Sequence, residues 1–264
     1  MADVAWEKTS TVYEKGNWTR RLDELIVEEP LSIRIGGHPY AVVMRTPGNE
    51  LDHAAGFCLA EGLIDTPEDM VTLGFCEEGT NVVTVTLTRE REEKVTGLLD
   101  RKGFVSQTSC GICGKEVIRD MEQVIAPAVD HTTFKATDVI ASLDTLVARQ
   151  DLYARTRGAH AAMILDENMS VMAMAEDVGR HNALDKAVGR VFRQGLGASA
   201  RVAVMSSRLS YELVQKAGRA GLELLVGMSR PTALAVHLAE SVNITLACIR
   251  YTELTVFSGE QRIL

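Results

Sequence analysis

VAVMSSRLSYELVQKAGRAGLELLVGMSRPTALAVHLAESVNITLACI, residues 202–249, alternates short apolar runs with longer amphipathic ones. The apolar runs at 202–205, 222–226 and 244–249 have the length of buried strands. The segments between them, 209–220 and 231–242, carry apolar residues at helical spacing, with Gly221 after the first and Pro231 near the start of the second. Strands that alternate with amphipathic helices indicate a layered α/β domain with a mixed sheet flanked by helices.

The same pattern continues upstream of this stretch. Residues 160–165 and 171–175 are expected to form strands on either side of a turn, and residues 181–194 a helix. A longer helix is predicted over 137–154, and a shorter one over 116–124. Downstream, residues 255–257 can add an edge strand. We therefore assign residues 117–264 to the main α/β domain.

A smaller α/β portion is predicted over residues 21–105. Two hairpins are expected, one from strands at 31–36 and 40–45 and one from strands at 71–76 and 81–88. Helices are expected at 50–62 and 89–100, and a short extended piece at 104–105. Residues 1–20 are polar, contain both tryptophans and show no period, so we expect a loosely held N-terminal arm there.

The composition of the chain excludes several classes of protein. The 264 residues are 46% hydrophobic and 24% charged, as in an ordinary soluble globular protein. A formal net charge of −8 argues against general binding to nucleic acid or to anionic membranes. No apolar run approaches a membrane span, and the first residues do not resemble a signal peptide. The cysteine count of 5 is odd and fits free thiols, so we expect a cytoplasmic protein.

Residues 107–115, QTSCGICGK, hold a C-x-x-C pair formed by Cys110 and Cys113. Thr, Ser and Gly around the pair favour a mobile loop over 106–116. Such a pair suits half of a zinc site, a dithiol redox couple or a nucleophilic thiolate that carries a persulfide. Zinc needs two further ligands at a recognised spacing, which the chain lacks, so we expect no structural metal. Lys115 and the following helix favour a thiolate, but the residues alone leave the three roles open.

Polar residues gather at three predicted strand-to-helix junctions, at 176–182, 206–210 and 229–232. Ligands of open α/β sheets bind beyond the carboxyl ends of strands, where helix N-termini offer free N–H groups to anions. Arg180, Arg208 and Arg230 can neutralise phosphate. Each residue alone fits a helix cap equally well, but the junctions together predict a pocket for a phosphorylated ligand.

The residues also resemble a known family. The segments 28–34, 44–50, 56–64, 109–115, 176–186, 210–217 and 231–240 resemble sequence blocks of the FdhD/NarQ family, from about residue 20 to near the end of the chain. This resemblance implies a cytidine-deaminase-like domain with an added N-terminal α/β portion, and a homodimer. Deaminase chemistry is not expected, because that site needs H-x-E followed downstream by a C-x-x-C.

The resemblance further implies a sulfurtransferase that serves formate dehydrogenase. Sulfur would pass from a cysteine desulfurase to Cys110, with Cys113 as its partner, and then to a molybdenum or tungsten cofactor. That cofactor is a bis-guanine-dinucleotide, bound as a substrate, so GDP can mimic it. The resemblance points to residues 248–253 as cofactor-contacting, and we add residues of the junction pocket. The predicted set is Arg180, His181, Ser206, Arg208, Ser229, Cys248, Ile249, Arg250, Tyr251, Thr252 and Glu253.

Two alternatives remain open at this point. The chain could hold the cofactor as a chaperone without transferring sulfur, or the C-x-x-C could belong to a zinc-stabilised module. Several residues also depart from the family pattern near the predicted pocket. They include Ala175, Ser207, Arg230 and the segment 247–249. The cysteine loop itself shows no such departure.

Overall fold

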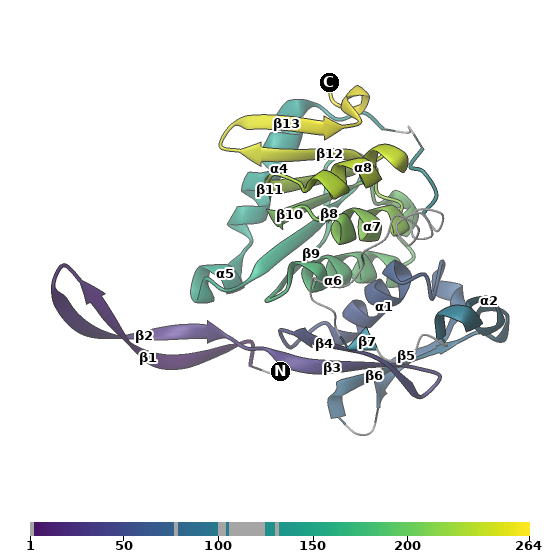
Figure 1. Cartoon of the computed structure of the whole chain (residues 1–264), viewed down its shortest axis with the longest axis horizontal. Coiled ribbons are helices and arrows are strands. Elements are labelled where there is room, and N and C mark those ends of the chain that lie inside the picture. The colour runs from purple at the N-terminus through teal and green to yellow at the C-terminus, as the bar shows by residue number, and fades with distance from the viewer. Residues whose placement is uncertain (1–2, 77–78, 100–103, 106–124, 130–131) are drawn as a thin grey trace.

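A six-stranded mixed sheet forms the centre of the larger part of the molecule (Figure 1). The computed structural model describes residues 3–76, 79–99, 104–105, 125–129 and 132–264. The strand order is β13-β12-β11-β10-β8-β9, in which β10, β11 and β12 run parallel and the other neighbouring pairs antiparallel. The strands are β8 (His160–Leu165), β9 (Val171–Asp177), β10 (Val202–Arg208), β11 (Leu224–Ser229), β12 (Thr245–Arg250) and β13 (Glu253–Ser258). The layered α/β prediction is confirmed.

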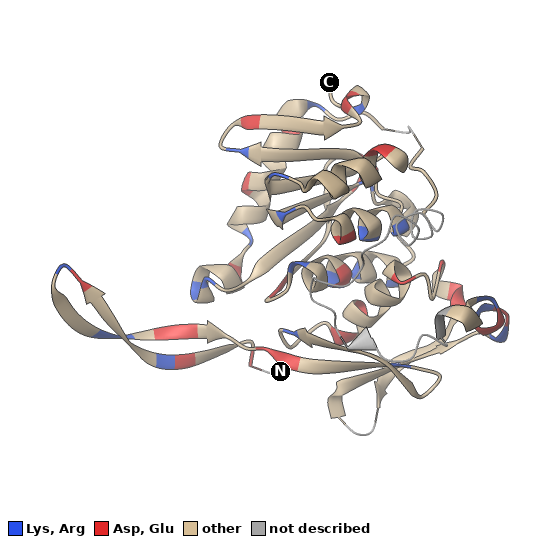
Figure 2. Cartoon of the chain, viewed as in Figure 1, with Lys and Arg blue, Asp and Glu red and all other residues tan. Residues whose placement is uncertain are grey.

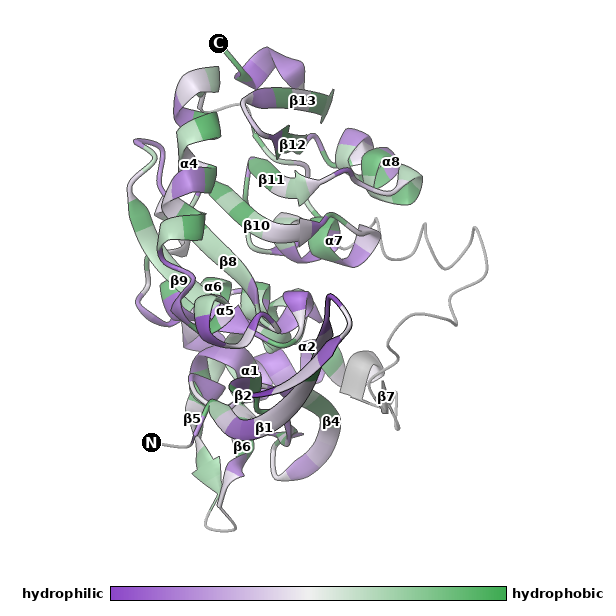
Figure 3. Ribbon diagram, turned by 90° about the vertical axis from the view of Figure 1, so that its left-hand side faces the viewer, coloured by the Kyte–Doolittle hydropathy of each residue, from purple (hydrophilic) through white to green (hydrophobic). Residues whose placement is uncertain are grey.

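Helices cover both faces of this sheet (Figures 1 and 3). On one face lies α4 (Ala136–Ala148), whose Val139 and Leu146 pack against Val202 and Val204. On the other face lie α6 (Arg180–Arg193), α7 (Tyr211–Arg219) and α8 (Ala233–Ser241). Strand residues alternate between the two faces. Because both faces are covered, the parallel strands read as continuous apolar runs.

The helix predicted over 137–154 is two helices, because α5 (Asp151–Thr156) begins separately after α4. The backbone N–H groups of Leu152 and Tyr153 each donate to the Glu176 carboxylate at 2.8 Å. That carboxylate caps α5 from a distant part of the chain. The break therefore arises from a tertiary contact that local periodicity does not reveal.

The N-terminal part is a five-stranded sheet in the order β5-β6-β3-β4-β7. Its strands are β3 (Glu29–Ile35), β4 (His38–Arg45), β5 (Met70–Cys76), β6 (Gly79–Leu87) and β7 (Phe104–Val105). Helix α1 (Glu50–Ala60) packs on this sheet, and α2 (Arg89–Leu99) follows β6. Both predicted hairpins and both predicted helices are present. Single 3-10 turns lie at Pro67–Asp69, Gly197–Ser199 and Glu260–Arg262.

The two sheets share one hydrophobic core through the contact between α1 and α6 (Figure 1). Leu31 and Ile33 of β3, Cys58 of α1, Leu184 of α6 and Met205 of β10 all belong to it and are fully buried. The boundary predicted near residue 105 therefore separates two sheets but not two independent cores.

Residues 5–26 form an antiparallel hairpin that extends away from the body of the molecule (Figure 1). Strand β1 (Ala5–Glu14) pairs with β2 (Asn17–Ile26) through a two-residue turn. Lys15 and Gly16 of this turn have φ values of 51° and 87°. Positive φ at both positions is the type I′ geometry that matches strand twist. The arm expected over 1–20 is thus ordered and continues to residue 26.

Several sequence predictions fall outside the described residues. They include the C-x-x-C loop at 106–116 and the helix predicted over 116–124. Within the described part of the chain, no helix combines the length and apolar content that crossing a membrane requires.

Candidate functional site

The polar junctions predicted from the sequence meet at one edge of the six-stranded sheet. Strands β10, β11 and β12 are parallel and end there, at Arg208, Ser229 and Arg250. Arg208 and Ser229 are direct neighbours in the register. Strand β9 runs in the same direction, because it is antiparallel to β8 and β8 is antiparallel to β10. Residues that follow Asp177 therefore reach the same edge, which we call the carboxyl edge.

His181 links two of the junctions. It lies in the first turn of α6, and its Nε2 is 2.8 Å from Glu212 Oε2 and 3.2 Å from Ser210 Oγ, both at the start of α7. The contact with His181 lowers the pKa of the Glu212 carboxyl, so this carboxylate remains charged. Ser210 ends the second polar junction of the sequence and Glu212 follows it, but their pairing with His181 could be seen only in the structure.

Basic side chains dominate the carboxyl edge (Figure 2). Arg208, Arg230 and Arg250 are exposed at the ends of their strands, and Arg180 is partly buried beside them. Burial lowers the pKa of the imidazole of His160, at the start of β8, and the nearby Arg180 and His181 lower it further. An electropositive edge on a chain of net charge −8 suits an anionic ligand. His160 was not among the predicted site residues, and only the antiparallel pairing of β8 with β10 brings it here.

The segment 248–253 divides into a buried and an exposed part. Cys248 and Ile249 are 5% and 1% exposed, and Ile249 belongs to the core under α4. Burial raises the pKa of the Cys248 thiol. Arg250 and Glu253 pair across the turn at 251–252, and all four of residues 250–253 are exposed. A ligand at this edge can therefore reach the side chains of the turn, whereas those of Cys248 and Ile249 support the strand.

Tyr251 is the most exposed large hydrophobic side chain of the described residues, at 87%. Its φ of 59° is unusual for a tyrosine and places it at the tip of the turn. The Arg250 guanidinium lies 5.6 Å from the centre of the Tyr251 ring. A planar cation over an exposed aromatic ring is a surface on which a further planar group can stack.

Ser206 and Ser229 differ in their availability. Ser206 Oγ accepts a hydrogen bond from the backbone N–H of Ala161 at 2.8 Å and so ties β10 to β8. Ser229 is exposed at the end of β11. Of the two predicted serines, only Ser229 is exposed and available to a ligand. Ser206 instead stabilises the pairing of β10 with β8.

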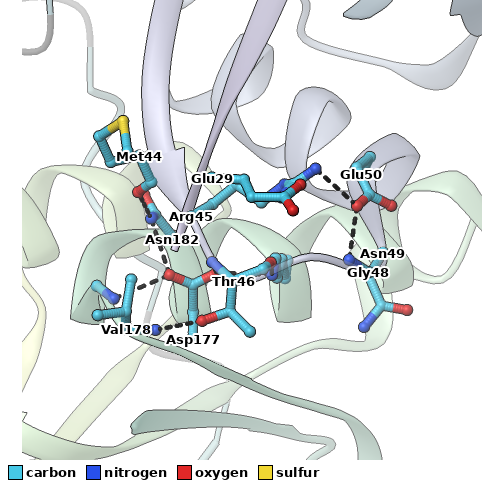
Figure 4. A network of polar contacts seen from close by, with 12 residues as sticks. Glu29, Met44, Arg45, Thr46, Gly48, Asn49, Glu50, Asp177, Val178 and Asn182 are labelled. Carbon is cyan, nitrogen blue, oxygen red and sulfur yellow. Dashed lines mark hydrogen bonds and ion pairs between the residues drawn. The ribbon is translucent and has the colours of Figure 1, made fainter. Parts of the chain in front are cut away.

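The segment 176–186, the most distinctive of the matching sequence blocks, mainly joins the two parts of the molecule (Figure 4). Asp177 is fully buried, and its carboxylate lies 2.6 Å from Lys186 Nζ. The same carboxylate accepts hydrogen bonds from Thr46 N at 3.1 Å and from Asn182 Nδ2 at 2.9 Å. Thr46 belongs to the loop between β4 and α1. These residues therefore hold the carboxyl edge on the N-terminal sheet.

A second ion pair joins the buried Asp185 to the partly buried Lys216. Lys216 Nζ of α7 donates to both carboxylate oxygens of Asp185 of α6 at 2.8 Å. The Lys216 ammonium also lies 5.8 Å from the centre of the Phe57 ring of α1. Burial raises the pKa of Asp185, and Lys216 opposes this shift. Helices α1, α6 and α7 are thus fixed to one another directly behind the site.

Cys110 and Cys113 lie outside the described residues, so their position relative to the carboxyl edge is not given by the structure. Of the remaining cysteines, Cys58 is fully buried and Cys248 nearly so. Burial raises the pKa of the Cys58 thiol far above its ordinary range, as expected of a core cysteine. Among the described residues, no cluster of His, Cys, Asp and Glu has the geometry to hold a metal ion.

Comparison with known proteins gives a consistent result. The sequence profile of the FdhD/NarQ family matches residues 26–264. A sulfur carrier protein FdhD of Mycobacterium tuberculosis is 39% identical over 260 residues, which cover 92% of each chain. The sulfur carrier protein FdhD of Nocardia farcinica is 40% identical over 252 residues, 92% of this chain and 89% of the relative.

A solved structure from Desulfotalea psychrophila, described as a proposed formate dehydrogenase accessory protein, has the same fold. The two superpose with a TM-score of 0.79 at 22% sequence identity, over 99% of this chain and 100% of that one. This similarity supports the arrangement of both sheets.

Proposed function

The chain belongs to the FdhD/NarQ family, and we propose on this basis that it is a sulfur carrier that serves formate dehydrogenase. The observation that carries the proposal is the combination of a C-x-x-C pair in the sequence with an electropositive edge built by strand ends and helix starts. The thiols would carry sulfur, and the edge would hold the phosphates of the acceptor. The proposed setting is the cytoplasm, where thiols stay reduced.

The proposed chemistry is exchange between a persulfide and a thiolate. The Cys110 thiolate attacks the outer sulfur of the persulfide on a cysteine desulfurase, a new S–S bond forms, and the donor cysteine leaves as a thiolate. In this exchange the transferred sulfur stays at the sulfane level, so loading of Cys110 needs no external oxidant or reductant. Cys113 can then release sulfide by attacking the inner sulfur. The dithiol supplies the two electrons for this step, and a thiol reductant must reduce the resulting Cys110–Cys113 disulfide before the next cycle.

The proposed acceptor is a bis-guanine-dinucleotide molybdenum or tungsten cofactor, bound as a substrate. Arg208, Arg250 and His181 would contact its phosphates, because charge-assisted hydrogen bonds to phosphate are the strongest contacts such an edge can offer. Tyr251 would contact a guanine base. The N–H groups at the starts of α6 and α7 add further donors.

Persulfide formation is tested by incubating the protein with a cysteine desulfurase and cysteine, followed by mass spectrometry of the peptide that contains Cys110. We expect a gain of one sulfur that a thiol reductant removes. Cys110→Ala should abolish the gain, while Cys248→Ala, which removes a buried thiol, should not affect it. A peptide without added sulfur would contradict the proposed transfer.

Binding at the carboxyl edge is tested by titrating GDP into wild-type protein and into Arg208→Ala. Loss of one arginine–phosphate contact should raise the dissociation constant by about tenfold or more. Arg89→Ala serves as a matched control, because it removes an exposed arginine of α2, which lies on the N-terminal part of the molecule and not at this edge. Equal affinities for all three proteins would exclude Arg208 from the site.

The alternative of a chaperone that only holds the cofactor is favoured by one observation. Arginines at the ends of β10 and β12 build the basic edge in the described part of the chain, and holding phosphate requires no thiol chemistry. Replacing both cysteines by Ala decides between the two functions. A chaperone would still activate formate dehydrogenase, whereas a sulfur carrier would not.

A further inference from the structure

The N-terminal arm presents an unpaired strand edge and exposed apolar side chains. Among the described residues, its sheet contains only β1 and β2. Trp18 is 68% exposed, Leu22 64% and Trp6 57%. An isolated two-stranded hairpin is at best marginally stable in water, and an open edge is a template for pairing with another strand. The distal half of the arm lies clear of the body of the molecule (Figure 1).

The register decides which backbone groups of β2 face outward. Val27 N donates to Val4 O at 3.0 Å, and hydrogen-bonded and non-hydrogen-bonded pairs alternate along an antiparallel ladder. The odd-numbered residues of β2 therefore bond to β1. The N–H and C=O groups of the even-numbered residues point to the open edge, and these residues are Trp18, Arg20, Leu22, Glu24 and Ile26. Within the described chain, no further strand pairs with this edge.

The charges of β2 are arranged symmetrically about Leu22. Residues 20–24 read Arg-Arg-Leu-Asp-Glu. If two copies of β2 pair antiparallel with Leu22 opposite Leu22, Arg20 lies opposite Glu24 of the second copy, and Arg21 opposite its Asp23. Trp18 then lies opposite Ile26. This register also joins outward-facing residues to outward-facing residues, so the ladder hydrogen bonds can form.

Other registers are disfavoured by the same charges. A shift of the symmetry axis by one residue places Arg21 or Asp23 directly opposite its own copy. A shift by two residues does the same to Arg20 or Glu24. Like charges directly opposite each other in a sheet are destabilising. Among the registers centred on residues 20–24, the one centred on Leu22 alone has an uncharged residue on the axis.

We propose that the open edge of β2 pairs with β2 of a second copy of this chain, antiparallel and centred on Leu22, to give a four-stranded intermolecular sheet. Some of these charges already have partners within each protomer. Arg21 Nε lies 2.8 Å from Asp23 Oδ1, and Glu24 pairs with Arg155 of α5, so the second copy must share or replace this partner of Glu24. Ile26, at the base of the arm, lies against Gly158, whereas the arm beyond Glu24 extends away from the body. Arg20 makes no ion pair within the described chain, so its charge is available to the second copy. The inference is independent of the sulfur-transfer chemistry.

The test uses the full chain and two charge reversals. In Arg20→Glu, Glu replaces Arg opposite Glu24 at both ends of the paired strands, and in Glu24→Arg two arginines face each other. Each variant alone should raise the dimer dissociation constant by about tenfold or more in sedimentation velocity, measured from about 1 to 100 µM. An equimolar mixture of the two variants restores both opposite-charge pairs and should dimerise like wild type.

Matched controls separate this register from a general effect of charge. Lys8→Glu and Glu14→Arg make the same charge changes on β1, outside the paired strand, and should dimerise like wild type. Arg155→Ala removes the partner of Glu24 within the protomer. The dimer dissociation constant of this variant shows how much that contact affects association. Circular dichroism checks that each variant is folded.

Three results would overturn the proposal: a monomeric wild type throughout this range, unchanged association of both charge-reversal variants, or a mixture that associates no better than either variant alone. Hydrogen exchange gives a second readout. Raising the protein concentration should slow exchange at the amides of Arg20, Leu22 and Glu24. The amides of Thr19, Arg21 and Asp23, already bonded to β1, should not change.

Discussion

At the scale of single residues, two glycines allow α1 and α6 to touch. A Cβ at Gly56 would lie 2.0 Å from the carbonyl oxygen of Asp185, and one at Gly189 would lie 1.9 Å from that of Asp52. Real atoms do not approach this closely, and the obstacle in both cases is helix backbone, which cannot rotate away. The glycines are therefore required by packing between helices.

Gly56→Ala should lower the free energy of unfolding by about 3 kcal/mol or more, because the helices must separate to admit the methyl group. Urea denaturation measures this. Gly97→Ala is the matched control, since Gly97 lies in α2 and a Cβ there meets nothing within 4 Å. That substitution should instead stabilise the protein by about 0.5–1 kcal/mol. Equal effects at both positions would show that the close approach is not maintained in solution.

His53 makes stability depend on pH. It is fully buried in α1, and its burial together with the nearby charges of Lys186, Lys216 and Arg45 holds its pKa well below the ordinary value of 6.5. The unfolded chain therefore binds a proton more readily than the folded one. The free energy of unfolding should fall as the pH drops below about 6.5, by up to about 1.4 kcal/mol per pH unit.

Replacing His53 by Gln should flatten this dependence between about pH 6.5 and 5. His160 has a lowered pKa as well and contributes in the same direction, so the measured quantity is the difference between variant and wild type. His38→Gln is the control, because His38 is exposed on the turn between β3 and β4. An unchanged slope in His53→Gln would contradict the assignment.

At the scale of elements, the contact between the β4–α1 loop and the β9–α6 junction depends on one buried ion pair. Asp177→Asn preserves the shape of the side chain but leaves the Lys186 ammonium, 1% exposed, without its counter-charge. Breaking a buried pair in this way costs about 3–5 kcal/mol. Adding Lys186→Met should recover part of the loss, because the orphaned charge is then removed. Chemical denaturation of the single and double variants measures both effects, and a single variant as stable as wild type would contradict them.

Elements with a clear period were predictable, and those that depend on distant contacts were not. The apolar runs of β10, β11 and β12 and the amphipathic stripes of α7 and α8 carry their own signal. The break before α5 depends on Glu176, which lies 24 residues from Leu152. The arm was missed as a hairpin because β2 lacks alternation and its turn is Lys-Gly, not the Asn-Gly that usually signals a type I′ turn.

The candidate site was likewise predictable in part: its position followed from the sequence, but the role of each residue did not. Polar residues after strands predicted the position of the carboxyl edge, because parallel strands must end on one side of a sheet. The sequence could not separate residues that face a ligand from those that hold the edge in place. Ser206 and Ile249 proved to support the sheet, while the pairing of His181 with Glu212 required knowledge of how α6 and α7 face each other.

At the scale of the whole molecule, the shared core predicts how the protein unfolds. One face of the six-stranded sheet is covered by α6, α7 and α8, and α6 in turn packs on α1 and thus on the N-terminal sheet. Separating the two parts would expose fully buried side chains of both, including Ala54, Cys58 and Leu184. It would also break the hydrogen bonds that the charged groups of Asp177 and Lys186 make with Thr46 of the β4–α1 loop.

Thermal unfolding should therefore be a single cooperative transition, although the chain contains two sheets. Calorimetry checks this by comparing the calorimetric and van't Hoff enthalpies, and tryptophan fluorescence serves as the control, because both tryptophans lie on the exposed arm. The arm has few contacts with the core, so its fluorescence can change before the main transition without affecting it. Two separate calorimetric transitions would show that the sheets unfold independently, and the contact between α1 and α6 would then not be the principal link between them.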